Sequence, residues 1–289
     1  MKIKLFGVRG SIACPGTETI GYGGNTACIY VEGIDSHLIF DAGTGIRLLG
    51  EEILQDMRPV YLFFSHYHWD HIQGFPFFKP AYQKDRELYL LSDHLPESPK
   101  SILEQMADPH FPVPVEYLKA TVQVLPINET GIDIGELTVT TLASNHPGGG
   151  CAYRIDSAHG SFAYITDNEL FPPQKPTTAY EHWPEFLRNI DLLIHDAMYL
   201  EEEREMIHGW GHSLIPQVLQ LAVDVRAKNL VLFHHDPSRT DAQLDQIAQD
   251  SKEWMKQQQD FQSKVFLARE GDCYYLDSGA VKHAPVSRQ

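Results

Sequence analysis

Short apolar runs that lead into histidine or aspartate recur along this chain of 289 residues. Each run is rich in β-branched or aromatic residues, which is typical of a buried β-strand. The runs are residues 60–65 before His66, 137–143 shortly before His146, 161–165 shortly before Asp167, 192–194 before His195 and Asp196, and 230–233 before His234 and His235. Strands that share a sheet can place such side chains along one edge, where α/β proteins commonly bind ligands. The pattern therefore predicts an α/β chain whose site lies at strand ends.

Three amphipathic segments predict helices that pack against these strands. Residues 241–258 place apolar side chains at helical spacing after Thr240, which suits an N-cap. Residues 214–225 follow Ser213 in the same way, and a third helix is expected after Gly45. Each helix is expected to bury one face on a sheet.

The stretch 94–119 differs from its surroundings because it combines five prolines with mixed polarity. It is expected to be an inserted loop or lid rather than a separate domain, since long loops of this kind are commonly functional. Its Phe111 and Tyr117 could stack on a base or cover a leaving group. The alternative is that both side chains pack locally.

The chain is acidic, because 23 Lys and Arg residues oppose 39 Asp and Glu residues and give a formal charge of −16. Such a field repels polyanions unless a local feature reverses it, so long nucleic acids and anionic membranes are expected to be poor partners. No apolar run approaches the roughly 18 residues that a membrane-spanning helix needs. The segment MKIKLFGVRG is interrupted by Arg9 and is expected to be a first strand rather than a signal peptide.

The four cysteines have no CxxC spacing, which disfavours both a disulfide framework and a thiolate zinc site. They are Cys14, Cys28, Cys151 and Cys273. We expect buried thiols and a cytoplasmic protein.

The chemistry is concentrated in residues 65–74, SHYHWDHIQG. His66 and His68 lie two residues apart, so in an extended segment their side chains point the same way and can bind one metal ion. Asp70 and His71 turn toward a different position, and one short loop could therefore supply ligands to two ions. The alternative is a polar turn with hydrogen-bonded histidines. Three histidines and one aspartate at HxHxDH spacing after an apolar strand favour the metal site.

This segment resembles the signature of the metallo-β-lactamase-fold hydrolases. The resemblance implies a four-layer αββα sandwich of the α/β (α+β) class, with residues 1–289 as one domain. The ligands that it implies for one ion are His66, His68 and His146. Those for the second ion are Asp70, His71 and His235, with Asp167 bridging the two ions. His234 adjoins His235 and is the alternative for this late ligand.

Further motifs resemble the ribonuclease Z and phosphonate-pathway phosphodiesterase branch of that family. They are FDAGTG (40–45), GVRGSIACPG (7–16), GGNTAC (23–28), IHDAMY (194–199) with GHS (211–213), and HHDPSR (234–239). The resemblance implies that Asp41 orders the metal loop and that His212 donates a proton to the leaving oxygen, paired with Asp196. Aspartate stands where glutamate is more usual, which shortens the reach of that pairing. Arg239 either touches phosphate or forms an ion pair with a neighbouring aspartate, Asp236 or Asp241.

The charge of such a centre favours anionic substrates. Two divalent ions offset by Asp70, Asp167 and a hydroxide leave about one net positive charge, and zinc can lower the pKa of bound water to about 7. Ligands without thiolate suit zinc, with manganese or iron as alternatives. The expected catalytic residues are Asp70, His212 and Asp196.

We therefore expect a metal-dependent hydrolase with two divalent ions, acting as a phosphodiesterase on a small anionic substrate such as a cyclic nucleotide or cyclic ribose phosphate. No basic arm between His71 and His146 marks a transfer-RNA substrate. A thioester or lactone hydrolase, an iron-dependent redox enzyme and a metal-binding sensor are the alternatives. A homo-oligomer is possible.

Overall fold

Two β-sheets form the centre of the molecule, and the computed structural model describes residues 1–92, 99–109, 111–127, 130–259 and 261–286. Within these residues the first sheet has eight strands and the second has seven. In spatial order, the first comprises β15 (Ala280–Ala284), β14 (Cys273–Asp277), β1 (Lys2–Gly7), β2 (Cys28–Glu32), β3 (His37–Phe40), β4 (Val60–Phe63), β5 (Glu87–Ser92) and β6 (Thr121–Pro126). The second comprises β13 (Lys264–Leu267), β12 (Asn229–Phe233), β11 (Leu192–Asp196), β10 (Gly160–Ile165), β9 (Cys151–Ser157), β8 (Leu137–Ala143) and β7 (Ile132–Ile134). The five strands predicted before His and Asp residues are β4, β8, β10, β11 and β12.

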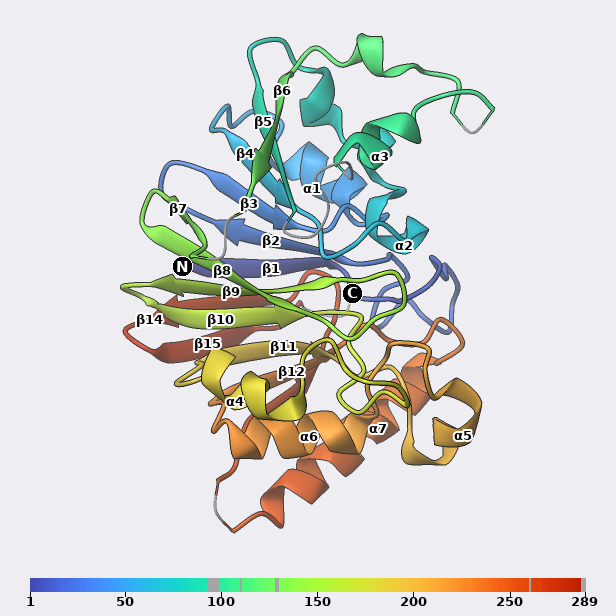
Figure 1. The fold of residues 1–289 in the computed structure, drawn as a ribbon, viewed down its shortest axis with the longest axis vertical. Coiled ribbons are helices and arrows are strands. Elements are labelled where there is room, and N and C mark those ends of the chain that lie inside the picture. Colours follow the sequence, from blue (N-terminus) through green and yellow to red (C-terminus); the bar gives the residue numbers. More distant parts are fainter. Residues whose placement is uncertain (93–98, 110, 128–129, 260, 287–289) are drawn as a thin grey trace.

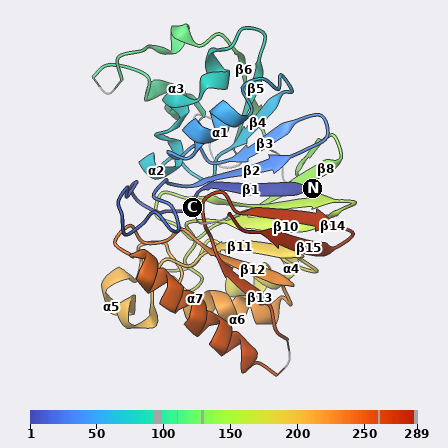
Figure 2. The same ribbon diagram turned by 180° about the vertical axis from the view of Figure 1, so that it is seen from behind.

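Helices cover the outer face of each sheet (Figure 1). On the first sheet lie α1 (Ile46–Glu52) and α3 (Pro99–Glu104); on the second lie α4 (Trp183–Phe186), α6 (Ile215–Asp224) and α7 (Asp241–Lys256), as the reverse view also shows (Figure 2). The shorter elements are α2 (Trp69–Ile72), α5 (Arg204–Ile207) and the 3₁₀ turns η1 (Phe75–Phe77), η2 (Lys79–Tyr82), η3 (Val115–Tyr117), η4 (Tyr180–His182) and η5 (Glu201–Glu203). No helix in the described part of the chain is long and apolar enough to cross a membrane.

Three apolar layers hold the sheets and helices together. Between the sheets, Phe40 of β3 stacks on Phe63 of β4 with ring centroids 4.9 Å apart and meets Phe162 of β10 edge-on at 6.0 Å. A second layer joins the outer face of the second sheet to α6 and α7, and a third joins the first sheet to α1 and α3. The order helices, sheet, sheet, helices is the predicted αββα sandwich, because each sheet buries one face on its partner and the other on helices.

Parallel pairing brings the polar strand ends to one edge. Phe40 of β3 pairs with Phe63 of β4, and β10, β11 and β12 run parallel in register. The residues that follow β10, β11 and β12 are therefore aligned within the second sheet, and a hydrogen bond of 2.7 Å from the Tyr164 hydroxyl of β10 to Asp41 brings the end of β3 beside them. Three of them leave their strands in the left-handed region, since φ is 61° at Asp41, 47° at Asp167 and 61° at His234. This backbone turns each side chain out of the regular alternation of the strand.

The helix starts agree with the sequence in one case and differ in another. Thr240 caps α7 as predicted, because its hydroxyl accepts a hydrogen bond from the Gln243 N–H at 3.3 Å. Ser213 is not the N-cap of α6, which is Leu214. The Ser213 hydroxyl instead donates to the Asn168 carbonyl at 2.6 Å, so it ties the helix start to the site.

The stretch 94–119 lies only partly within the described residues, since 94–98 and 110 are outside them. Its described part contains α3 and η3. Phe111 packs locally, with its ring 5.6 Å from that of Phe77, while Tyr117 is 61% exposed. The lid remains a prediction.

The four cysteines are free thiols. Cys28 and Cys151 are buried as expected, whereas Cys14 and Cys273 are only partly buried. Burial raises the pKa of the Cys28 thiol well above its ordinary value, which keeps it protonated and unreactive.

Candidate metal centre

Six histidine rings form a closed circle at the shared strand edge, with two carboxylates among them. Neighbouring rings lie with centroids 4.2 to 5.4 Å apart, in the order His66, His68, His146, His212, His234 and His71. The sequence predicted five of these histidines for the site, and the structure adds His234. Side chains from both sheets therefore converge on one point.

Asp167 divides this circle into two groups. Its Oδ2 lies 3.6 Å from Nε2 of both His66 and His146, and its Oδ1 lies 3.2 Å from His71 Nε2 and 3.1 Å from His234 Nε2. Each carboxylate oxygen thus faces a different set of ring nitrogens.

The donor atoms form groups that suit metal ions. One group is His66, His68, His146 and Asp167; another is Asp70, His71 and His234; a third, overlapping one is Asp167, His212 and His234. The first two contain the predicted ligands, except that His234 stands in place of His235. Imidazole and carboxylate donors without thiolate are typical of divalent zinc, manganese and iron sites.

Unpaired buried nitrogens show that the cluster fits a cation. Among the described residues, the Nε2 atoms of His66, His71 and His234 are buried without a hydrogen-bond partner. Such atoms normally find a partner, because an unsatisfied buried polar group costs about 1–3 kcal/mol. Their convergence on Asp70 and Asp167 gives a divalent cation a ready set of ligands.

Asp41 orders the metal loop from behind, as expected. Its carboxylate accepts hydrogen bonds from the Ser65 N–H at 2.7 Å, the Ser65 hydroxyl at 2.8 Å, His71 Nδ1–H at 2.8 Å and the Tyr164 hydroxyl at 2.7 Å. The bond to Nδ1 fixes the His71 tautomer and leaves Nε2 for the centre. Tyr164 comes from the second sheet, so Asp41 also joins the two halves.

Burial and neighbouring charges determine the ionisation of each side chain in the cluster. Burial raises the pKa of Asp70, but His71 and His234 lower it well below its usual range. The Ser11 N–H adds a hydrogen bond to Asp70 Oδ2 at 2.7 Å. Burial lowers the pKa of His66, and the neighbouring His71 lowers it further. His66 is therefore neutral, which is the form that binds metal.

His234, not His235, faces the centre, and this corrects the predicted ligand set. His235 Nε2–H donates to the Ala268 carbonyl at 2.8 Å, and burial lowers the pKa of this ring to about 3. The left-handed turn at His234 sends its ring inward instead. Gly10 makes room for that ring, since a Cβ at position 10 would lie 2.4 Å from His234 Cε1.

His212 and Asp196 pair beside the cluster. His212 Nδ1–H donates to Asp196 Oδ2 at 2.9 Å, so the shorter aspartate does reach. Asp196 is itself held by the Asn168 and Met198 N–H groups, at 3.3 and 3.1 Å. Burial lowers the pKa of His212, but the carboxylates of Asp196, Asp167 and Asp70 outweigh it and raise the pKa to about 9.

Glu169 is a site residue that sequence reasoning missed. Its buried carboxylate accepts hydrogen bonds from the Gly209 N–H at 3.0 Å and the Gly211 N–H at 3.0 Å. The Gly211 carbonyl in turn accepts from His146 Nδ1–H at 3.1 Å, which leaves His146 Nε2 for the centre. Glu169 thus positions the loop that carries His212. Only its closeness to Asp167 in sequence hinted at this role.

Arg239 forms neither of the predicted ion pairs with Asp236 and Asp241. Its guanidinium forms an ion pair with Glu203. Asp241 instead accepts hydrogen bonds from the N–H groups of Gly21 and Tyr22, at 2.7 and 3.0 Å. Arg239 therefore fixes the loop after β12.

Comparisons with known proteins agree with this fold. A family model described as a beta-lactamase superfamily domain matches residues 37–235. Ribonuclease Z of Haloarcula marismortui is 22% identical and covers 94% of this chain and 95% of its own length. Two solved structures resemble the chain in fold. The metallo-beta-lactamase fold protein YhfI from Bacillus subtilis has a TM-score of 0.68 at 17% identity, covering 95% of this chain and 99% of its own. A diphosphatase from the PhnP family has a TM-score of 0.65 at 16% identity, covering 96% and 98%.

One of these relatives corrects an expectation about partners. The chain is similar over nearly its whole length to a protein named as a ribonuclease, so the prediction that long nucleic acids are poor partners is wrong. The formal charge of −16 is a sum over the whole chain. Binding at a cleft depends on the local field, which a metal centre dominates.

Proposed function

The chain belongs to the beta-lactamase superfamily and is a metal-dependent hydrolase, and we propose that it cleaves phosphodiesters with two divalent ions placed on either side of Asp167. The observation that carries the proposal is the division of the cluster by the two oxygens of Asp167. His66, His68 and His146 would hold one ion, and Asp70, His71 and His234 the other. Zinc suits these donors, with manganese or iron as alternatives.

Two divalent ions held by these residues would supply Lewis acidity to the phosphoryl group and would activate water near neutral pH. The protein's own side chains orient this chemistry. Asp41 holds His71, and the Gly211 carbonyl holds His146, each through Nδ1. Both rings thus present Nε2 in a fixed direction. Asp167 lies between the two ligand groups and contacts both.

His212 is the proposed general acid. Asp196 holds its Nδ1, so Nε2–H is left to donate a proton to the leaving alkoxide. An alkoxide leaves poorly unless it is protonated, and a positioned acid contributes about 10²–10⁴ in rate. Thioester and lactone hydrolysis do not need an acid at this place, so the His212–Asp196 pair favours phosphodiesters.

Two substrate classes contain the bond that this site suits. A small phosphodiester, such as a cyclic nucleotide or cyclic ribose phosphate, needs no surface beyond the centre. RNA is favoured by a specific observation, the likeness to Ribonuclease Z over 94% of the chain. Both present an alkoxide leaving group, and the same mechanism serves each.

The test compares leaving groups in zinc-loaded protein. The substrates are a 2′,3′-cyclic nucleotide, a short RNA, bis(p-nitrophenyl) phosphate, a lactone and a thioester. We expect turnover of the phosphodiesters, with His212→Ala losing on the order of 10²–10⁴ in kcat for alkoxide leaving groups and much less for p-nitrophenolate.

The matched control is His182→Ala, which removes an exposed histidine from η4. It is expected to behave as wild type, and His212→Ala is expected to retain both metals. A preference for the lactone or thioester would contradict the proposal. So would an equal loss of kcat for all leaving groups in His212→Ala, or loss of metal from that variant.

A further inference from the structure

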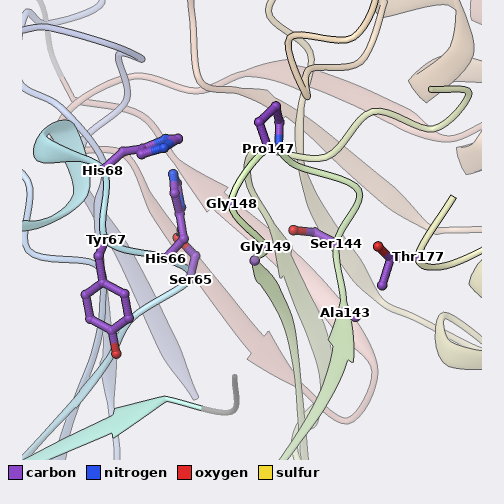
Figure 3. Close-up of a pocket in the computed structure, with 11 residues that line it drawn as sticks. Ser65, His66, Tyr67, His68, Ala143, Ser144, Pro147, Gly148, Gly149 and Thr177 are labelled. Carbon is purple, nitrogen blue, oxygen red and sulfur yellow. Dashed lines mark hydrogen bonds between the residues drawn. The ribbon is translucent and has the colours of Figure 1, made fainter. Parts of the chain in front are cut away.

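A cavity of about 410 Å³ opens beside the metal centre, on the side of His66 and His68. Figure 3 shows its two walls: Ser65 to His68 form one, and the segment from Ala143 to Gly149 forms the other. Its volume lies within the range of about 300–1,000 Å³ that is typical of small-molecule sites. The cavity shares two histidines with the cluster, so a group inside it could be bonded to a phosphorus atom at the metals.

Ser144 provides the cavity with a buried polar group. The residue is 2% exposed, and its Oγ has no hydrogen-bond partner among the described residues. The hydroxyl is turned into the space between the walls (Figure 3). Gly150 leaves room for it, because a Cβ at position 150 would lie 2.3 Å from Ser144 Oγ. A buried hydroxyl without a partner costs free energy unless a ligand forms a hydrogen bond with it.

The wall opposite the histidines exposes backbone rather than side chains. Gly148 and Gly149 both have a φ of +87°, and a Cβ at either position would meet nothing within 4 Å. The turn at Gly148 and Gly149 presents peptide groups to the cavity, and the imidazole rings of His66 and His68 lie on the other wall. The space between these walls suits a planar ring with one polar edge, with that edge toward Ser144.

The position of the cavity decides which half of a substrate enters it. His212 and His234 do not line it, and around the circle of rings His146 separates His68 from His212. The leaving oxygen must lie near His212 to receive its proton. The group in the cavity is therefore the one that stays esterified to phosphate.

We propose that this cavity binds the planar ring of the retained group, with a nucleobase as its occupant and Ser144 as the hydrogen-bonding partner of the base. The inference rests on the proposed phosphodiesterase function and adds a specificity pocket to it. It makes the enzyme selective for nucleoside phosphodiesters over alkyl ones.

The experiment keeps the leaving group constant and varies the retained group. Zinc-loaded protein is given the p-nitrophenyl esters of methyl phosphate, phenyl phosphate and thymidine 5′-phosphate. We expect kcat/KM to rise from methyl to phenyl to thymidine. Ser144→Ala should lower the value about three- to tenfold for the thymidine ester alone, as loss of one hydrogen bond implies.

A second variant fills the cavity from its exposed rim. Thr177 lines the cavity and is exposed, so Thr177→Trp can fold normally. It should lower kcat/KM on the order of tenfold or more for the phenyl and thymidine esters and leave the methyl ester unchanged. Thr121→Trp, on an exposed position of β6, is the matched control and should change none of them.

The outcomes separate the pocket from the reaction. Equal slowing of all three esters by Thr177→Trp, or no slowing of any, would overturn the pocket while leaving the phosphodiesterase intact. Absence of hydrolysis in the loaded wild type would overturn the proposed function. Calorimetric binding of thymidine 5′-monophosphate then still tests the pocket, since Thr177→Trp and Ser144→Ala must weaken it.

Discussion

Asp41 and Asp167 occupy corresponding places in the two sheets and have different surroundings. Each follows a buried strand, each is itself buried, and each is left-handed, with φ of 61° and 47°. Asp41 is enclosed by donors, namely an N–H, two hydroxyls and an imidazole Nδ1–H. Asp167 faces the Nε2 atoms of four histidines. The strand end thus determines where a carboxylate lies, and its neighbours determine whether it orders a loop or faces a cation.

The largest expected effect is at Asp167. Asp167→Ala removes the carboxylate that both ligand groups share, so it should lose both ions or retain only weak binding. Metal analysis of the purified variant measures this. Asp277→Asn changes an exposed aspartate in β14 and is the control. A fully loaded, active Asp167→Ala protein would refute the two-metal site and remove the contrast with Asp41.

His234 and His235 differ in the same way, because one faces the metal centre and the other is held by a hydrogen bond, and the expected loss of metal is smaller than for Asp167. His234→Ala should lose about one ion per chain, because His234 belongs to only one of the two main groups. His235→Ala should keep both ions and lose stability instead, since a buried hydrogen bond to Ala268 disappears. Metal content and urea unfolding of the two variants, measured together, test the assignment. Loss of metal in His235→Ala with full metal in His234→Ala would reverse it.

Substitution of Asp41 should lower the stability of the protein more than its metal content. Asp41→Asn keeps the side chain's shape and tolerates the left-handed backbone, but it places a donor among donors. We expect a loss of about 1–3 kcal/mol in the free energy of unfolding of zinc-free protein. Urea unfolding measures this loss. If metal binding falls as far as in Asp167→Ala while stability stays unchanged, Asp41 acts as a ligand and the comparison fails.

The smallest expected effect is a shift in one titration. Carboxylates raise the pKa of His212 above its ordinary value to about 9, so the stabilisation from its charge is present below pH 6.5 and is lost as the pH rises through 9. Asp196→Asn removes the nearest carboxylate and should bring the pKa down. NMR titration of zinc-free protein follows the imidazole directly. An unchanged pKa in Asp196→Asn would show that Asp196 does not set the charge of His212.

Local spacing allowed the centre's main loop to be predicted. His66, His68, Asp70 and His71 lie within six residues, so the extended geometry and the short turn of α2 determine where they point. The apolar runs likewise predicted that His146 and Asp167 lie at strand ends, and the family resemblance grouped them with that loop. The α/β class followed from the same pattern, whereas the four-layer αββα sandwich followed only from the family resemblance.

Contacts between distant segments explain what the sequence could not predict. Strand alternation does not distinguish His234 from His235, because the left-handed turn that selects His234 depends on space provided by Gly10. The role of Glu169 depends on N–H groups 40 and 42 residues away. Serine is a residue type that favours the N-cap position, yet the Ser213 hydroxyl donates a hydrogen bond to the Asn168 carbonyl instead of capping the helix.

The position of β1 inside its sheet has a consequence for the growing polypeptide. One neighbour, β2, follows soon after, but the other is β14, and the amino group of Met1 bonds the Leu276 carbonyl 275 positions later. At translation speeds of about 5–20 residues per second, that edge waits on the order of 15–55 s for its partner. An open edge is a template for aggregation, and lysines on it discourage pairing with other chains. Lys2 and Lys4 lie on this strand, so their charges oppose pairing of the open edge with other chains during synthesis. In the folded protein the same lysines form ion pairs with Glu32 and Glu52.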